Sequence, residues 1–149
     1  MQLKQSVYTT CLQLLNNKIT TLQNTLHELG EGAINDGKSS AGDKHETARA
    51  MMQLEQEKIS KQLDEVLAQK TALQKIDVTI STEQITKGSL IKTNKGYLFL
   101  SIALGKINVE GVDVIILSPQ SPLGLKLMGL QVKSSVAINS TVYIIEEVL

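Results

Sequence analysis

Two carboxylates and an imidazole stand close together near the middle of the chain, in the segment Gly42-Asp43-Lys44-His45-Glu46. Their oxygen and nitrogen atoms are possible ligands for a divalent cation. A hard cation such as Mg²⁺ normally keeps several waters and shares its other ligands with a substrate or a partner, so an autonomous metal site is not expected here. Metal-assisted cleavage of a phosphodiester is the chemistry that a shared site of this kind would serve.

The same two acids also have a structural explanation. Asp43 followed three residues later by Glu46 is similar to a capping box, in which the two side chains satisfy free amides at the start of a helix. The residues alone leave open whether the acids only cap or also act elsewhere. The other histidine, His27, lies within a predicted helix and is expected to be partly exposed.

Apolar residues in steps of four and three predict a long helix on each side of this segment. The first helix is expected over residues 2–31, and the second from Asp43 to about Leu73 or Lys75. Residues 32–42 are rich in Gly, Ser, Asn and Asp and predict a loop. The expected seam residues are Tyr8, Leu12, Leu15, Ile19, Leu22, Leu26, Leu29 and Ala33, facing Met52, Ile59, Leu63, Val66 and Leu73. This pattern predicts an antiparallel coiled-coil hairpin, whose first helix is roughly 40–45 Å long.

The period changes after Lys75 from helical to alternating, beginning with Val78 and Ile80. Short β-like runs follow at residues 89–92, 97–102, 114–117, 136–138 and 142–145, separated by turn signals. A short helix is expected from Ser121 to Gly129, with Pro122 in its first turn. The sequence therefore predicts an α+β fold, with a long α-helical hairpin over residues 1–76 and a small β-rich domain with one short helix over residues 77–149.

Composition limits the function classes. Formal net charge is zero, which argues against autonomous binding to DNA or RNA. Cys11 is the single cysteine, which excludes a disulfide framework and a Cys-based zinc site and leads us to expect a half-buried, inert thiol. No membrane span, signal peptide or nucleotide-binding glycine motif is recognisable, so a cytoplasmic protein without a membrane partner and without an active site of its own is expected.

Two motifs carry a resemblance to a known family. The segment from Gly42 to Ala48 is similar to an acidic tip, an Asp-x-x-Glu pair followed by a small-residue helix start. The segment from Ser118 to Val132 is similar to a C-terminal signature with Ser-Pro, an apolar short helix and a Gly before the next strand. With the order of the two halves, these motifs resemble the bacterial Gre transcript cleavage factors, which bind RNA polymerase, over nearly the whole chain.

The resemblance implies a transcription elongation factor that is an accessory to RNA polymerase and not an enzyme. It implies that an FKBP-like globule docks on the polymerase through a segment containing Ser121, Pro122 and Leu123. The helical arm would enter the secondary channel, where Asp43 and Glu46 help the polymerase to hold Mg²⁺ and to cleave backtracked RNA. The implied factor has no cofactor of its own, contacts nascent RNA indirectly and DNA only through the polymerase, and acts as a monomer.

Thr47, Arg49 and Ala50 depart from the family pattern, which usually has Asn, an acid and an aromatic residue there. This departure keeps open a Gre-like secondary-channel regulator that does not stimulate cleavage. Two alternatives from other classes are a prolyl isomerase built on the FKBP-like globule and a structural adaptor that oligomerises through its coiled coil. An isomerase needs an aromatic-lined pocket, and the C-terminal half offers only Tyr97, Phe99 and Tyr143 for it.

Overall fold

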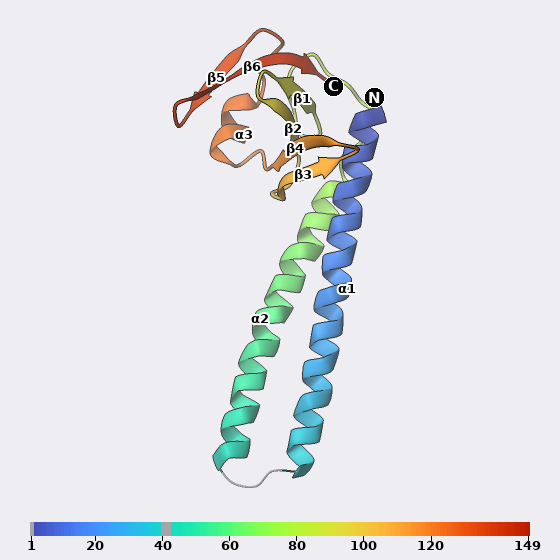
Figure 1. The fold of residues 1–149 in the computed structure, drawn as a ribbon, viewed down its shortest axis with the longest axis vertical. Helices are drawn as coiled ribbons and strands as arrows, with labels where there is room; N and C mark the ends of the chain where they lie inside the picture. The colour runs from blue at the N-terminus through green and yellow to red at the C-terminus, as the bar shows by residue number, and fades with distance from the viewer. Residues whose placement is uncertain (1, 40–42) are drawn as a thin grey trace. The chain divides into compact units, whose positions relative to one another are not determined.

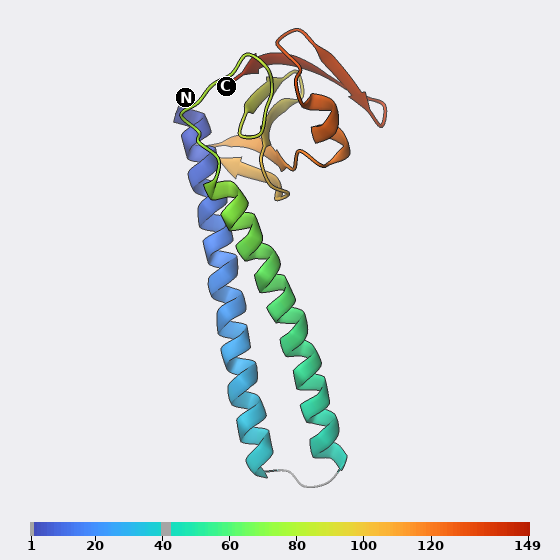
Figure 2. The same cartoon turned by 180° about the vertical axis from the view of Figure 1, so that it is seen from behind.

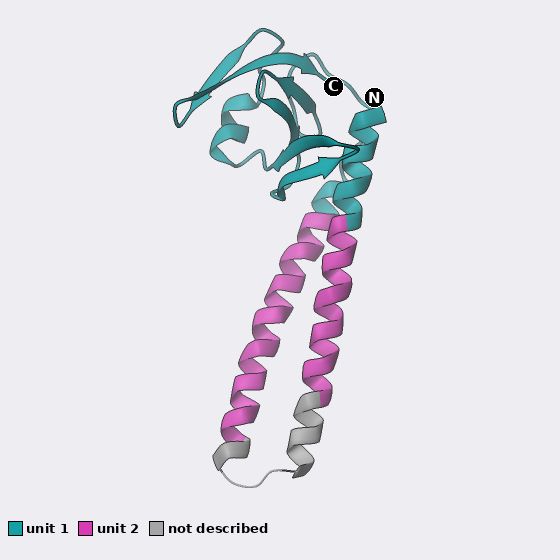
Figure 3. Ribbon diagram, in the orientation of Figure 1, with its two compact units in different colours: residues 1–13, 71–149 teal, residues 14–70 magenta. Residues whose placement is uncertain are grey.

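The structure is a computed structural model that describes residues 2–39 and 43–149, except for the side chains of residues 32–45. Helices α1 (Gln2–Ser39) and α2 (Asp43–Gln74) are followed by six strands and one short helix, which confirms the α+β class (Figure 1). The chain divides into two compact units, one of Met1–Gln13 with Thr71–Leu149 and one of Leu14–Lys70 (Figure 3). In the described residues, no helix is both long enough and apolar enough to cross a membrane.

Helix α1 is longer than the sequence predicts. It continues to Ser39, so the predicted loop is wrong for residues 32–39, while residues 40–42 lie outside the described part. Each residue added to an existing helix gains one backbone hydrogen bond. A glycine costs only about 1 kcal/mol against alanine in a helix, which lowers helix stability without ending the helix.

Helix α2 begins at Asp43 and ends at Gln74, as predicted. Within the Leu14–Lys70 unit, α1 and α2 lie side by side and run in opposite directions (Figures 1 and 2). Leu15, Ile19 and Ile59 are buried there, and all three belong to the expected seam. The two helices therefore cover a narrow apolar stripe between them.

The globule is built on one mixed sheet with the strand order β3-β4-β2-β1-β6-β5. The strands are β1 (Leu90–Thr93), β2 (Gly96–Leu100), β3 (Gly105–Val109), β4 (Val112–Leu117), β5 (Ser135–Ile138) and β6 (Thr141–Val148). Strands β2 and β4 pair in parallel, and every other pair is antiparallel. Helix α3 (Pro122–Leu127) leads from β4 to β5.

Both faces of the central strands are buried. On one face lies a cluster of eight buried apolar residues that includes Leu127 of α3; it consists of Ile85, Ile91, Leu98, Leu100, Leu117, Leu127, Val136 and Ile145. The alternate residues Leu90, Phe99, Val114 and Ile116 are also buried and point to the other face. Because both faces of these strands are covered, their sequences are nearly continuous apolar runs. Such runs between turn residues are what predicted the strands from the sequence.

The first turns of α1 belong to the globule and lie beside β3 and β4 (Figures 1 and 2). Val7 and Cys11 are completely buried there, whereas the expected seam residues Tyr8 and Leu12 are only half-buried. The heptad pattern assumes a second helix as the partner, and here the partner is the globule, so a different stripe of α1 faces inward. For the same reason the compact units divide within α1, after Gln13, and within α2, after Lys70.

Lys4 is a buried charge in the first turns of α1, with 1% of its surface exposed. Its Nζ donates a hydrogen bond of 2.7 Å to the Ile80 carbonyl oxygen. Burial lowers the pKa of this amine, and the nearby Asp77 carboxylate partly offsets the effect. The amine thereby ties the segment after α2 to the start of α1.

Two details of the β region differ from the prediction. Val78 and Ile80 are not in a strand, because the Asp77 side chain accepts hydrogen bonds from the backbone and hydroxyl of Thr79 and closes a turn. Strand β3 was not predicted; it lies between the two turn signals Leu104-Gly105 and Glu110-Gly111, and Lys106 and Asn108 alternate in it with apolar residues. It is an edge strand, and its polar side chains are exposed.

Cys11 is expected to react very slowly with a thiol reagent such as dithionitrobenzoate. Burial raises the pKa of its thiol from 9.0 to about 12, which lowers the thiolate fraction about 10³-fold at pH 8. We expect a native reaction rate at least about 10³-fold below that of the urea-unfolded chain. A native thiol that reacts as fast as the unfolded one would contradict the burial of Cys11.

Candidate functional site

The acidic segment lies where α1 and α2 are connected. Asp43 is the first residue of α2, and Glu46 is exposed in the first turn. Thr47 and Arg49 are also exposed. The side chains of residues 32–45 lie outside the described part, and the predicted cap by Asp43 and any ligand role of His45 fall within that range. The structure therefore places the Glu46 side chain at the surface and the Asp43 backbone at the helix start.

The chain by itself supplies few ligands to a cation in this place. Among the described side chains, no three acidic, histidine or cysteine residues gather into a possible metal site. Carboxylate oxygens suit Mg²⁺, but an octahedral ion needs six ligands, and Asp43 and Glu46 supply only two carboxylates. A cation held by these acids would take its remaining ligands from water, a substrate or a partner.

The second candidate segment, before and within α3, is built on a tight turn. The Ser121 amide donates to the Ser118 carbonyl oxygen at 3.1 Å, and the Ser121 hydroxyl donates to the same oxygen at 2.6 Å. The Ser121 hydroxyl also accepts from the Gly124 amide at 3.0 Å, which makes Ser121 the N-cap of α3. Pro122 occupies the first turn, and Gly129 follows the helix with φ +83°, as the sequence predicts.

Gly124 is the residue on which this turn depends. A β-carbon there would overlap the Ser118 carbonyl oxygen and would lie 2.8 Å from the Ser121 hydroxyl oxygen. The glycine is buried in α3, and the backbone of the preceding turn passes directly against it. The apolar helix therefore keeps its close approach to the Ser-Pro turn only with glycine at this position.

The predicted docking residues do not share one environment. Pro122 is exposed, Ser121 is engaged in the cap, and Leu123 packs against the buried cluster. The exposed apolar residues of this region are Leu125, 66% exposed, and Met128, 42% exposed. Sequence reasoning did not single them out, although their spacing of three after Pro122 places all three on one side of a helix.

Hydrogen bonds tie the C-terminal end of α3 to β5 and to the segment before β1. Lys126 Nζ donates to the Ala137 carbonyl oxygen of β5 at 2.8 Å. The Gly129 amide donates to the Ile85 carbonyl oxygen, and the Ile85 amide donates to the Leu130 carbonyl oxygen, both at 2.8 Å. The surface formed by Pro122, Leu125 and Met128 is therefore presented by a rigid element.

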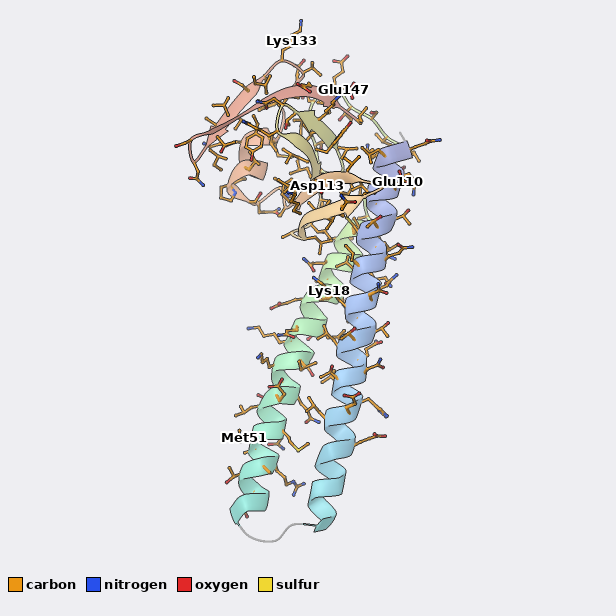
Figure 4. All side chains as sticks on the ribbon, in the orientation of Figure 1. Lys18, Met51, Glu110, Asp113, Lys133 and Glu147 are labelled. Carbon is orange, nitrogen blue, oxygen red and sulfur yellow. The ribbon has the colours of Figure 1, made fainter. Side chains whose placement is uncertain are left out.

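Two carboxyl groups of the globule have lowered pKa values. The hydrogen bonds from Thr79 lower the pKa of Asp77. The hydrogen bond from Asn108, followed by contact with Lys106, lowers the pKa of Asp113, which lies near Glu110 in the β3–β4 hairpin (Figure 4). Both groups are exposed, and their partners close local turns, so we assign them a structural role.

No protein-family model, curated protein or solved structure matches the chain.

One structural observation bears on the isomerase alternative. Phe99 is completely buried in the sheet and cannot form the wall of an open pocket. Tyr143 is half-buried and packs against the apolar cluster on the α3 side of the sheet. A site lined by aromatic rings would therefore have to form without Phe99.

Proposed function

We propose that this chain is an accessory factor of bacterial RNA polymerase of the Gre type, which inserts its helical pair into the secondary channel and stimulates cleavage of backtracked RNA. One observation carries the proposal: α2 begins at Asp43, beside the connection of two long antiparallel helices, and Glu46 is exposed in its first turn. The Asp-x-x-Glu pair thus stands at the end of the helical pair, where a narrow channel could admit it.

The length of the helices supports this role. Helix α1 has 38 residues and α2 has 32, which correspond to roughly 57 Å and 48 Å at 1.5 Å per residue. We interpret the two helices as an antiparallel coiled coil. A stiff carrier of this length can bring two carboxylates to a distant active site, and fixing reacting groups in position is itself a large catalytic contribution.

The globule supports the docking role. We interpret its mixed sheet, with one short helix on one face, as an FKBP-like domain, and the surface formed by Pro122, Leu125 and Met128 as its contact with the polymerase. Exposed apolar residues on a rigid helix are typical of a protein-binding surface. Ser121 and Leu123 would act indirectly, by shaping the turn and by anchoring α3 to the core.

In the proposed reaction, this chain contributes charge and position. Asp43 and Glu46 would share an Mg²⁺ ion with the polymerase, and the ion would supply the Lewis acid and activated water for phosphodiester cleavage. The chain alone would have no catalytic activity, because the other ligands and the substrate belong to the polymerase.

A cleavage assay on backtracked complexes tests the role of the tip acids. Purified polymerase is stalled on a template with labelled RNA, and the cleavage rate is measured with and without the full chain. The double substitution Asp43→Asn, Glu46→Gln is expected to reduce the stimulated rate about tenfold or more, because metal ligands and their supports typically contribute 10–100-fold. Competition with the wild-type chain measures whether the variant still binds the polymerase.

The matched control is Glu57→Gln, Asp64→Asn, which removes the same two charges from exposed positions of α2 away from its start. It is expected to leave stimulation unchanged. If the wild-type chain binds polymerase without accelerating cleavage, we would attribute this to Thr47, Arg49 and Ala50, which differ from the family pattern. The chain would then be a secondary-channel regulator that does not stimulate cleavage. If it does not bind polymerase at all, the proposed function is overturned.

A further inference from the structure

The helical pair has an open groove that the proposed function does not use. It lies along α1 and α2 within the Leu14–Lys70 unit and has a volume of about 660 Å³. Its apolar floor is formed by Leu14, Leu22 and Val66. Leu14 is 36% exposed, and the other two are half-buried. The groove therefore leaves apolar surface in water along the middle of the pair.

The helical pair covers little apolar surface by itself. In the described part of this unit, Leu15, Ile19 and Ile59 are the buried apolar residues, while Met51, Leu54 and Leu67 are exposed by 40–66%. Most of the stability of a helix in a protein comes from packing its apolar face. A third and a fourth helix over the groove would complete packing that two helices leave unfinished.

The charges at the groove indicate what kind of partner fits it. Lys18, on α1 (labelled in Figure 4), and Glu65, on α2, are exposed and line its two opposite sides. Among the residues that the structure describes, neither takes part in an ion pair. The groove thus has a cation on one side and an anion on the other, and a surface of this kind is complementary to itself.

We propose that the groove is the interface of a homodimer, in which two helical pairs form a four-helix bundle around Leu14, Leu22 and Val66. A two-fold axis parallel to the helices lays α1 of each protomer over α2 of the other, in antiparallel contact. Lys18 and Glu65 line the same groove from its two helices, and in this arrangement each Lys18 faces the partner's Glu65. The dimer has two identical cross-pairs and one apolar core.

The bundle has a consequence for the proposed function, although it rests on separate observations. Two helical pairs together are wider than one, so the form that enters a narrow channel is the monomer. The dimer would therefore be inactive toward polymerase. Dilution, or binding of the monomer to polymerase, would shift the equilibrium toward the monomer.

A charge swap tests the interface without polymerase. Sedimentation velocity of the full chain is measured at protein concentrations from about 1 µM to 1 mM. The apparent mass of the wild type is expected to rise with concentration, from 16.3 kDa toward twice that mass. Lys18→Glu and Glu65→Lys, each alone, are expected to raise the dissociation constant at least about tenfold, because each removes two attractions and creates two repulsions. The double variant Lys18→Glu, Glu65→Lys is expected to restore the wild-type value, since it recreates both cross-pairs.

The control is Glu57→Lys, a charge reversal at an exposed α2 position outside the groove, which is expected to leave the dissociation constant unchanged. Circular dichroism at 222 nm checks that every variant is helical. The proposal is overturned if the wild type stays monomeric throughout, which leaves the groove to a helix of a different protein. It is equally overturned if single reversals have no effect or if the double variant does not recover.

Discussion

Replacing Phe99 with alanine is expected to lower the free energy of unfolding of the globule by about 3–5 kcal/mol, the typical cost of emptying a buried phenylalanine site. Phe99 is the single phenylalanine of the chain and is completely buried. It stands on the central strand β2, opposite Leu90 of β1 and opposite Ile116 of β4, both of which are also buried. The substitution opens a cavity on one face of the sheet, beside the buried side chains of Leu90 and Ile116.

Tyrosine signals make this prediction measurable. The chain has no tryptophan, and its three tyrosines, Tyr8, Tyr97 and Tyr143, all belong to the compact unit that contains the globule. Urea unfolding followed by near-ultraviolet circular dichroism therefore reports on that unit alone, while the signal at 222 nm is dominated by the long helices. A Phe99→Ala midpoint close to that of the wild type would show that Phe99 is not in the core.

Leu125→Ala is the matched control, because it also truncates an apolar side chain of the globule, from a position that is 66% exposed. Its expected effect on the free energy of unfolding is below about 0.5 kcal/mol. The contrast between the two variants separates the loss of core packing from a general effect of shortening an apolar residue.

Replacing Gly124 with alanine is expected to cost about 3 kcal/mol. The added methyl group would overlap the Ser118 carbonyl oxygen, so the Ser-Pro turn must move away from α3. Overpacking costs about 1–3 kcal/mol. Displacing Ser121 from the Gly124 amide removes a helix cap, which typically contributes about 1 kcal/mol.

The same chemical change at Gly30 is the control. A β-carbon at Gly30 meets no atom within 4 Å, and the residue lies within α1. Gly30→Ala is expected to raise the stability measured at 222 nm by about 0.5–1 kcal/mol, because alanine loses less backbone entropy in a helix. If Gly124→Ala leaves the tyrosine-detected midpoint unchanged, the turn before α3 is more adaptable than its contacts indicate.

The ends of α3, the start of α2 and most strands could be predicted from residue types alone. The bounds of α3 follow from Ser121, Pro122 and Gly129, since a cap, a fixed φ and a positive φ each need a particular residue type. The start of α2 at Asp43 was also predicted from the residue types around it. Five of the six strands were predicted because their apolar residues stand in short runs between turn residues, and these interactions all lie within a few positions along the chain.

The end of α1 could not be read in this way. Glycine and polar residues favour a loop over residues 32–39, yet the helix continues there to Ser39. The residue types give the free-energy cost of adding each residue to a helix. The position where the helix ends depends on the sum of many such small free energies. Edge strand β3 was not predicted for a related reason. Exposed polar residues in a strand resemble those of a loop, and only the antiparallel pairing with β4 identifies them as a strand.

The sequence by itself determined the order of two long helices and a β-rich globule, and it placed an Asp-x-x-Glu pair at the start of the second helix. Only the tertiary structure decided that β2 and β4 pair in parallel, that Val7 and Cys11 face the globule, and that Leu123 is turned inward while Leu125 and Met128 are exposed. The physical reason is the range of the interactions. Capping, turns and periodicity are local, whereas strand pairing and the choice of buried stripe depend on partners far away in the chain.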